Sequence, residues 1–521
     1  MKNRGSITIP ISQLSTEKET EFKIVVRNDT DYAVQDFKIP KIPPMTTMNP
    51  EETAKPTSTS SAIPTKPTPT SSVTSSGSPS GSTSPTPASS TPAASPTTSS
   101  SPVEPSKTGK TYYVSKDGSD SNSGLEESKP LKKIQTGIDK LKAGDKLIIK
   151  AGTYKEKLSI KKSGSKEKPI TIVASGSVKV DGNKKGGILL KVNSGAKYIT
   201  INNIAFQNLH GQEARGISLA SNTKHITIEK CSFTNISCPN PSSESSTANA
   251  IYFEGSGKSE SSAIEQITIK NCKLSKICPG WSEGISVDGN CKNITIDGVT
   301  ATADGVETNI AICICGNDKE TNSANSVNRP RGVTVKNCNV SGCKSPYDQD
   351  SYGIYVDGAY DVTIENNTVS NSEGGIEVGS EKKNSSFSNK ETQKVTVKGN
   401  SINNCACGLY IGGDKEESRS GYVYNVTVTG NTLKNCGIKG KTEVVTFDRC
   451  NKVTFSNNTL TATNKARMIY VRDSAKSLTF KKNSYSNGRK ASDDYSFGKE
   501  NSDYSFSKWV SKFGDTDSTF K

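Results

Sequence analysis

β-Branched and polar residues alternate in nine copies of one eight-residue pattern between residues 226 and 485. This alternation is typical of a strand with one buried face. The copies recur every 25 to 41 residues, a spacing that suits one coil of a solenoid with loops of varying length. They are ITIEKCSF (226–233), ITIKNCKL (267–274), ITIDGVTA (294–301), VTVKNCNV (333–340), VTIENNTV (362–369), VTVKGNSI (395–402), VTVTGNTL (426–433), VTFSNNTL (453–460) and LTFKKNSY (478–485), with a degenerate tenth at Tyr198.

The sixth position of the pattern holds Cys in the earlier copies and Asn in the later ones. Residues of one type that recur at one turn form internal ladders when coils stack about 4.8 Å apart. The pattern therefore predicts an all-β fold, a right-handed parallel β-helix of about ten coils over residues 110–490. The ladder residues are Cys231, Cys272, Cys338, Asn367, Asn400, Asn431, Asn458 and Asn483.

A short amphipathic helix is predicted before the first coils, over about 130–141. Its apolar residues Leu131, Ile134, Ile138 and Leu141 have the three-and-four spacing of one helical face. We expect this helix to cover the N-terminal end of the solenoid, whose open strand edges would otherwise pair with other chains. Residues 491–521 are expected to form a C-terminal tail.

The segments before the solenoid differ sharply in composition. Residues 51–109 are almost wholly Pro, Ser and Thr, which predicts an extended linker. Residues 1–50 contain strand-like alternation at 6–10 and 21–26, and we interpret them as the C-terminal fragment of a small β-module. A carbohydrate-binding module would suit that position. Neither a signal peptide nor a membrane span is recognisable, so we expect an N-terminally incomplete sequence of a secreted, monomeric protein.

The net charge and the cysteines qualify this interpretation. A formal charge of +15 favours polyanionic ligands such as acidic plant cell-wall polysaccharides, although lysines also solubilise strands. Nucleic acid is not expected, because no basic run is interleaved with aromatic residues. Most of the thirteen cysteines are expected to be buried thiols at inward positions. A bridge such as Cys338–Cys343 is left open.

A second pattern follows many copies of the first and predicts another face of each coil. Its copies are GISLAS (216–221), AIYFEG (250–255), GISVDG (284–289), AICICG (311–316), GIYVDG (353–358), GIEVGS (375–380) and GLYIGG (408–413). Because the second and fourth positions are apolar, the third and fifth should face solvent. Stacking would then place Tyr252, Tyr355, Glu377 and Tyr410 in one column, and Glu254, Asp288 and Asp357 in the next.

The segments YYVSKDGSDSNSG and AGDKLIIKAGTYKEKL resemble the N-terminal region of the pectate-lyase-like superfamily of secreted right-handed β-helix proteins, and of family 9 polysaccharide lyases in particular. The resemblance implies a lysine base beside aspartates that hold calcium. Ala303-Asp304-Gly305 matches part of that family's motif. The following VETNIAIC lacks the lysine, and no Asp-Asp pair stands on the next coil, so the family's base is not carried over.

These residues support a polysaccharide lyase that cleaves pectate-like chains by β-elimination with calcium. Two alternatives stay open: a glycoside hydrolase that uses two of the same carboxylates, and a non-catalytic glycan-binding β-helix. The Asp-Gly pairs at 288–289 and 357–358 can equally well serve only to form the turn that ends each strand. The candidate catalytic residues are Glu377, Asp357, Glu381 and Lys382; the candidate substrate-binding residues are Tyr252, Tyr355, Tyr410, Glu254 and Arg419; the candidate calcium ligands are Asp288, Asp304 and Asp357.

Overall fold

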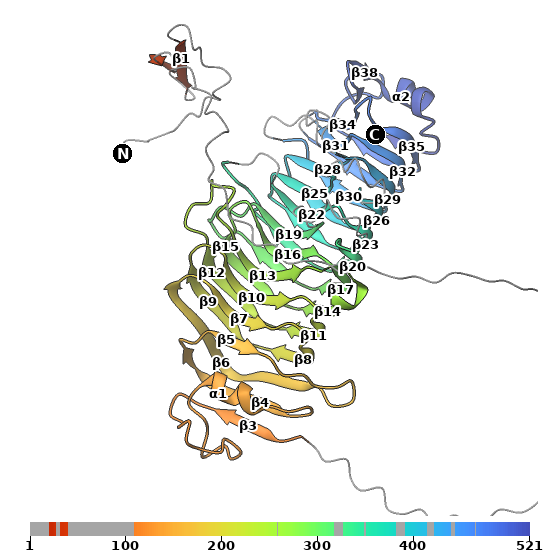
Figure 1. Cartoon of the computed structure of the whole chain (residues 1–521). Helices are drawn as coiled ribbons and strands as arrows, with labels where there is room; N and C mark the ends of the chain where they lie inside the picture. The colour runs from red at the N-terminus through yellow and green to blue at the C-terminus, as the bar shows by residue number, and fades with distance from the viewer. Residues whose placement is uncertain are drawn as a thin grey trace, which may run out of the picture. The chain divides into compact units, whose positions relative to one another are not determined.

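The computed structural model describes residues 20–27, 32–39, 109–257, 259–316, 327–347, 351–381, 391–413, 421–438, 443–463 and 465–521 (Figure 1). The chain divides into two units, residues 1–99 and 100–521. In the first unit, β1 (Thr20–Arg27) and β2 (Tyr32–Ile39) form an antiparallel pair. The predicted strand over 21–26 thus lies in β1, whereas 6–10 and all of the predicted linker except Gly109 lie outside the described residues.

The second unit is a parallel β-helix, as predicted, in which successive coils stack along one axis (Figure 1). A 24-stranded sheet takes two strands from most coils, and a 13-stranded sheet takes one. The larger sheet starts with β3 (Thr111–Val114), β4 (Lys146–Tyr154) and β6 (Ile170–Lys185). Its strands that carry the first half of the repeated pattern are β8 (Lys197–Asn202), β11 (Lys224–Glu229), β14 (Ile264–Lys270), β17 (Cys291–Asp297), β20 (Arg331–Lys336), β23 (Tyr360–Glu365), β26 (Gln393–Lys398), β29 (Val423–Thr429), β32 (Cys450–Ser456) and β35 (Lys476–Lys481).

The second half of each pattern forms a following strand in the same sheet. These strands are β9 (Ala205–His210), β12 (Ser232–Ser237), β15 (Lys273–Cys278), β18 (Thr300–Thr302), β21 (Asn339–Ser341), β24 (Thr368–Ser370), β27 (Ser401–Asn403), β30 (Thr432–Lys434), β33 (Thr459–Thr461) and β36 (Ser484–Ser486). The 13-stranded sheet contains β5 (Leu158–Ile160), β7 (Ile188–Val192), β10 (Ala214–Ala220), β13 (Ala248–Gly255), β16 (Glu283–Gly289), β19 (Ile310–Cys315), β22 (Tyr352–Asp357), β25 (Gly374–Val378), β28 (Cys407–Ile411), β31 (Glu443–Phe447), β34 (Arg467–Val471), β37 (Phe497–Lys499) and β38 (Ser502–Tyr504).

A ladder of buried amides joins the later coils, as the sequence predicts. The side-chain amide of Asn367 donates to Asn400 at 3.0 Å, and that of Asn400 donates to Asn431 at 2.9 Å. The residue just before each ladder position has a left-handed backbone, for example Asn366 at φ 56° and Gly399 at φ 64°. Asn and Gly tolerate this conformation best, so the pattern encodes the corner between its two strands as well as the strands themselves.

Two caps close the ends of the solenoid (Figure 1). The predicted N-terminal helix is α1 (Ile134–Lys140), shorter than expected. Its Ile134 and Ile138 are buried, and so are Leu131 and Leu141, which flank it. The expected C-terminal tail packs on the last coils. There α2 (Phe506–Phe513) buries Trp509 completely, and β39 (Thr519–Phe520) pairs with β36. The chain also forms a 3₁₀ turn, η2 (Glu260–Ser262).

Candidate functional site

The outward face of the 13-stranded sheet carries the two predicted columns side by side. Register places one residue from each successive strand in line, from β10 to β34. We call the first the tyrosine column: Ser218, Tyr252, Ser286, Cys313, Tyr355, Glu377, Tyr410, Thr446 and Tyr470. We call the second the acid column: Ala220, Glu254, Asp288, Cys315 and Asp357. The predicted juxtaposition of the columns is confirmed, whereas the roles of the residues remain predictions.

The columns are less exposed than the alternation predicts. Tyr355 is only 6% exposed and Asp357 only 7%. The Tyr355 ring packs on the outer side of the sheet against Ile310 and Cys313, so this part of the outward face has a small apolar cluster of its own. The prediction that every third and fifth residue faces solvent is therefore wrong at these two positions, and also at the buried residues Ser218, Ser286 and Cys313. Glu377 and Tyr410 are partly exposed.

Tyrosine hydroxyls hold the carboxylates of this face in place. Tyr252 donates to Asp288 at 2.9 Å, and Tyr355 donates to Glu381 at 2.8 Å. The backbone N–H of Glu381 in turn donates to Asp357 at 2.9 Å. Burial, followed by the charge of the acid beside each hydroxyl, raises the pKa of both Tyr252 and Tyr355 above the ordinary value of 10. Both phenols therefore stay protonated at neutral pH and act as hydrogen-bond donors.

Glu254, predicted to bind substrate, lies within an ion-pair network. Its carboxylate contacts Lys191 at 3.3 Å and Arg215 at 3.1 Å, and it accepts a hydrogen bond from Ser218 at 2.5 Å. The Arg215 guanidinium also stacks 3.8 Å from the centre of the Tyr252 ring. Glu254 therefore fixes Arg215 and Tyr252 at one end of the acid column.

Glu283, at the start of β16, is a functional candidate that the sequence interpretation missed. Burial raises the pKa of its carboxyl to about 7. Hydrogen bonds from Ser286 and Ser282 oppose this increase in pKa, and the charges of Asp288 and Glu381 add to it. A carboxyl group that keeps its proton near neutral pH beside other acids is the usual form of a general acid. The sequence signal was weak because Glu283 comes one residue before the aligned pattern.

The predicted calcium ligands do not form a metal site in the described part of the chain. Across those residues, the only His, Cys, Asp or Glu ligand atoms that come within 4.8 Å of one another in a group of three belong to Glu283, Cys313 and Cys315. Those two sulfurs form a disulfide, which removes the thiolates that a metal would need. Calcium prefers six or more oxygen ligands, so the described residues do not fit this ion.

Asp304 lies at the wrong end of the sheet for the predicted calcium site. It follows β18 and precedes β19, whose first residue, Ile310, pairs with Glu283. Asp288 is five residues further along β16, a distance of about 16 Å in an extended strand. The Asp304 backbone has φ 51°, and its carboxylate accepts a hydrogen bond from Thr302 at 2.8 Å. Asp304 therefore closes a turn.

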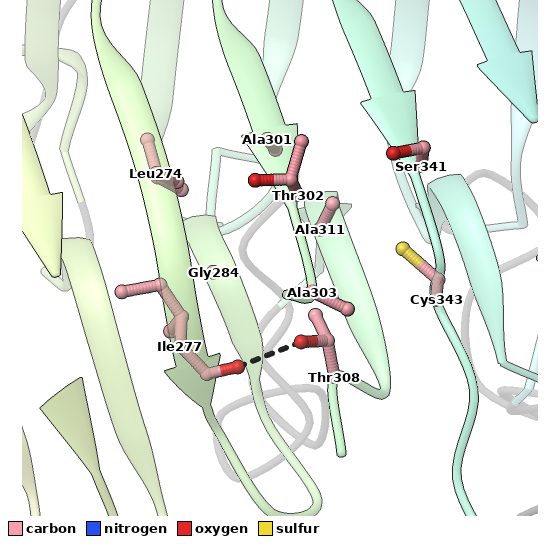
Figure 2. A pocket seen from close by; sticks show the side chains of 10 residues that line it. All are labelled: Leu274, Ile277, Gly284, Ala301, Thr302, Ala303, Thr308, Ala311, Ser341 and Cys343. Atoms are coloured by element: carbon pink, nitrogen blue, oxygen red, sulfur yellow. Dashed lines mark hydrogen bonds between the residues drawn. The ribbon is translucent and has the colours of Figure 1, made fainter. Parts of the chain in front are cut away.

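Beside this turn, small side chains leave an apolar pocket between β15, β18 and β21 (Figure 2). Ala301, Ala303 and Ala311 line it, and the Thr308 hydroxyl at its edge donates to the carbonyl of Ile277 at 2.8 Å. The volume is about 10 Å³, which is enough for about one water molecule. This pocket cannot hold a sugar ring.

A larger pocket continues the tyrosine column toward the C-terminus. It has a volume of about 130 Å³. We call it the tyrosine pocket and define it by its lining residues, Tyr352, Cys407, Tyr410, Glu443, Thr446, Tyr470 and Arg472. Glu377 pairs in register with Tyr410, so most of the pocket lies beyond the acids along the sheet, while Tyr352 lines it from β22. The sequence interpretation named only Tyr410 of this set, because the later strands lack the second pattern.

Two predicted site residues, Lys382 and Arg419, lie outside the described residues. Residues 317–326, 348–350 and 382–390, in the loops between coils, also lie outside the described residues. Two basic residues that follow the first of these loops, Arg329 and Arg331, are buried. Arg329 donates to the carbonyls of Ala359 and Glu391 at 3.1 and 2.9 Å, so it ties coils together.

Comparisons with known proteins find β-helix relatives. A family model described as Pel9A-like, right handed beta helix region, matches residues 112–289, and one described as right handed beta helix region matches 215–413 and 322–505. The chain is 30% identical over 293 residues to the uncharacterized protein YwoF of Bacillus subtilis (strain 168). That match covers 53% of this chain and 59% of YwoF, so the chain spans less than two thirds of that relative.

Several solved structures are similar in fold at low sequence identity. A rhamnogalacturonan lyase is 14% identical with a TM-score of 0.46, over 65% of this chain and 84% of its own. The GH136 lacto-N-biosidase from Eubacterium ramulus is 14% identical with a TM-score of 0.44, and the match covers 71% of this chain and 65% of that protein. The alginate lyase from Paenibacillus sp. str. FPU-7 is 18% identical with a TM-score of 0.41, and the match covers 61% of this chain and 95% of that protein. Among the described residues, no helix has the length and apolar character needed to cross a membrane.

Proposed function

Because this chain belongs to the right-handed β-helix family, we propose that it is a polysaccharide-cleaving enzyme whose site is the outward face of the 13-stranded sheet. The observation that carries the proposal is the register that sets the tyrosine column beside the acid column. Tyrosine rings stack on sugar faces, and carboxylates bind hydroxyls or transfer protons. A repeated set of both along one sheet suits a polymeric ligand that lies across several coils.

Hydrolysis is the reaction that the described carboxylates favour. Glu283, whose pKa is raised to about 7, can donate its proton to the oxygen that leaves the broken glycosidic bond. Glu381 is held by Tyr355 and is close enough to raise the pKa of Glu283. Its carboxylate would either accept the proton of the water that adds to the sugar, or attack the sugar to form a covalent intermediate that water then hydrolyses with Glu283 as the base.

Calcium-assisted β-elimination is the second candidate, favoured by the Pel9A-like match over residues 112–289. That match ends at β16, so Tyr355, Asp357, Glu377 and Glu381 lie beyond it. The base would be a lysine or arginine such as Lys382 or Arg419. Since the described carboxylates do not fit a calcium ion, we derive no step through one. Under this second candidate the protein would be secreted and would act on an acidic plant cell-wall polysaccharide.

The products distinguish the candidates. Purified protein is incubated with polygalacturonate, alginate and xylan, each with added calcium and with chelator. Hydrolysis should release reducing ends without the ultraviolet absorbance of an unsaturated sugar, whereas elimination produces both. A non-catalytic glycan-binding protein would bind one of these polymers and release neither product, which would overturn the proposal of an enzyme.

The matched variants are Glu283→Gln and Glu365→Gln. Glu365 pairs with Lys398 at 2.8 Å on the 24-stranded sheet, so its variant makes the same chemical change on another face. Loss of a general acid should lower kcat for Glu283→Gln by about 10²- to 10⁴-fold, while Glu365→Gln keeps full activity. Equal activity of Glu283→Gln and the parent protein would exclude Glu283 as the acid.

A further inference from the structure

We propose that the tyrosine pocket is a subsite for an uncharged pyranose residue of the substrate, separate from the bond that is cleaved. The proposal rests on the proposed function for the identity of its ligand as part of a polysaccharide. Binding of a single sugar in the pocket is nevertheless a property that can be measured without any turnover.

The pocket lies on the same line as the acids. Register runs from Glu377 to Tyr410, then to Thr446 and Tyr470, in three successive strand pairs. Three steps between parallel strands amount to about 14 Å. A pyranose residue extends a glycan by a length similar to one such step. A chain bound along the sheet at Glu377 would therefore reach Tyr470 about three residues further on.

The walls of the pocket suit the face and edge of a sugar ring. Three of its lining residues are tyrosines, and Tyr352 is 4% exposed and lies against Gly374, where a Cβ atom would overlap its ring. Because Gly374 has no side chain, the Tyr352 ring can lie in this position without a clash. The Tyr470 hydroxyl donates to the carbonyl of Glu500 at 2.8 Å, which fixes the orientation of the ring. Rigid aromatic faces with a few polar groups are typical of sugar sites.

The charges around the pocket argue against an acidic sugar. Arg467, beside the Tyr470 ring, contacts Glu443 at 3.0 Å and Asp503 at 2.8 Å. Arg472, which lines the pocket, lies 3.9 Å from Asp448. Among the described residues, these two guanidinium groups thus lie beside three carboxylates. Within that described set a uronate carboxylate would meet no excess positive charge, despite the net charge of +15 for the whole chain.

Hydroxyl groups, in contrast, find both kinds of partner. Glu443 offers carboxylate oxygens as acceptors, Arg472 offers N–H donors, and Thr446 offers a hydroxyl that can act as either. Asp448 is fully buried behind the pocket, where it accepts hydrogen bonds from Ser474 at 2.5 Å and from Tyr410 at 3.2 Å. Asp448 therefore orients Tyr410 and does not itself contact the ligand.

The test uses two sugar pairs that differ only at C6, D-galactose against D-galacturonate and D-glucose against D-glucuronate. Binding to the full chain is measured by ligand-observed NMR and calorimetry, at low and at high salt. We expect a neutral sugar to bind more tightly than its uronate and with little dependence on salt. Tighter, salt-sensitive binding of the uronate, or no binding of any neutral sugar or oligosaccharide, would overturn the proposal.

Two variants locate the bound sugar. Tyr470→Ala and Arg472→Gln should each weaken binding at least tenfold, whereas Tyr495→Ala, at a tyrosine 56% exposed, and Arg489→Gln should not change it. Tyr470→Leu removes the aromatic face but keeps an apolar side chain, and serves as the test if Tyr470→Ala does not fold. Binding that is unchanged in Tyr470→Leu and Arg472→Gln alike would place the sugar elsewhere.

A variant of the proposed acid separates this inference from the proposed function. Glu283→Gln should bind monosaccharides as the parent protein does, because Glu283 does not line the pocket. If the protein cleaves no polysaccharide but binds neutral sugar in this pocket, the subsite proposal stands and the proposal of an enzyme is wrong. A protein that cleaves glycans with unchanged kinetics in Tyr470→Leu and Arg472→Gln would show the reverse: the proposed function would stand and the subsite would be excluded.

Discussion

The Tyr355 hydroxyl donates to a carboxylate oxygen of Glu381 at 2.8 Å, and this bond joins the middle of β22 to the segment that follows β25. The Glu381 N–H also donates to Asp357 at 2.9 Å. A residue outside the regular strands is thereby held over the acid column by two contacts. One is made by its backbone and one by its side chain.

The Tyr355–Glu381 bond predicts a specific kinetic effect for Tyr355→Phe. A hydrogen bond to a charged group contributes about 1.5–3 kcal/mol, so its loss should lower kcat by about 10- to 100-fold with little change in KM. Steady-state kinetics on the cleaved polysaccharide check this result. Tyr198→Phe, on the 24-stranded sheet, is the control. An unchanged kcat for Tyr355→Phe would mean that Glu381 needs no positioning.

Glu283→Gln should stabilise the protein at alkaline pH while it removes activity. The carboxyl of Glu283 has a pKa of about 7 in the folded chain and an ordinary pKa of 4.5. Between these values the unfolded chain has lost the proton and the folded chain keeps it, so stability falls as pH rises through this window and stays lower above it. With allowance for partial exposure, the penalty at pH 8 is about 2 kcal/mol.

Glutamine carries no such penalty at any pH. Denaturant unfolding at pH 4 and pH 8 should therefore show a smaller decrease in the free energy of unfolding for Glu283→Gln than for the parent protein. Comparing the two pH values cancels any constant effect of the substitution itself. The free energy of unfolding of Glu365→Gln should decrease between pH 4 and pH 8 by as much as that of the parent protein. An equal decrease in all three proteins would mean that the pKa of Glu283 is not raised.

Chelation of calcium should leave turnover within about twofold of its original value, because the described carboxylates do not converge on a calcium-sized site. The measurement is the initial rate after dialysis against chelator, then after calcium is added back. A rate that collapses on dialysis and returns with calcium would favour the elimination candidate. It would also mean that ligands outside the described residues complete the site.

The sequence predicts the fold of this protein better than its site, for a physical reason. The eight residues of one copy determine the strands, the corner and the ladder. In one copy, Asn366 forms the corner, Asn367 belongs to the ladder and Val369 lies in a strand. The column neighbours of Tyr355 and Asp357 also follow from aligning the second pattern. By contrast, the pKa of Glu283 is raised first by burial among neighbouring coils, and further by charges that include that of Glu381, almost a hundred residues later in the chain. No local pattern contains that information.

The same limit applies to Asp304 and to the C-terminal segment. The motif around Asp304 shows that a turn is present. It does not show that this turn lies beside the start of β16, at Glu283, and not beside its end, at Asp288. Residues 491–521 lack the repeated pattern, so their packing through Trp509 was not visible in it. The tyrosine pocket was missed in part because Arg472 and Glu443 stand on coils that lack the second pattern.

The disulfide predicts how many cysteines react. All thirteen cysteines lie in the described residues, and eleven of them, including Cys338 and Cys343, are thiols that form no disulfide. Cys313 and Cys315 are bonded to each other. Alkylation of the denatured, unreduced protein should therefore modify eleven cysteines by mass spectrometry, and reduction should raise the number to thirteen. Modification of all thirteen without reductant would contradict the Cys313–Cys315 bond.

The amide ladder predicts a graded loss of stability at Asn400. Its side-chain N–H groups donate to Ile364 at 3.0 Å and to Asn431 at 2.9 Å, and its oxygen accepts from Asn367. Alanine would leave these buried groups without partners, at a cost of about 2–4 kcal/mol. Cysteine should cost less, because Cys272 at the equivalent position keeps one such bond, to the Ile228 carbonyl at 3.6 Å.

Urea unfolding of Asn400→Ala and Asn400→Cys measures this order, with Asn403→Ala as the control. Asn403 is only partly buried and donates to a neighbouring hydroxyl, so its removal should cost less than about 1 kcal/mol. If Asn400→Cys were as destabilised as Asn400→Ala, the thiol ladder of the early coils would not substitute for the amide ladder of the later ones. The mixture of Cys and Asn at this position would then reflect packing volume alone.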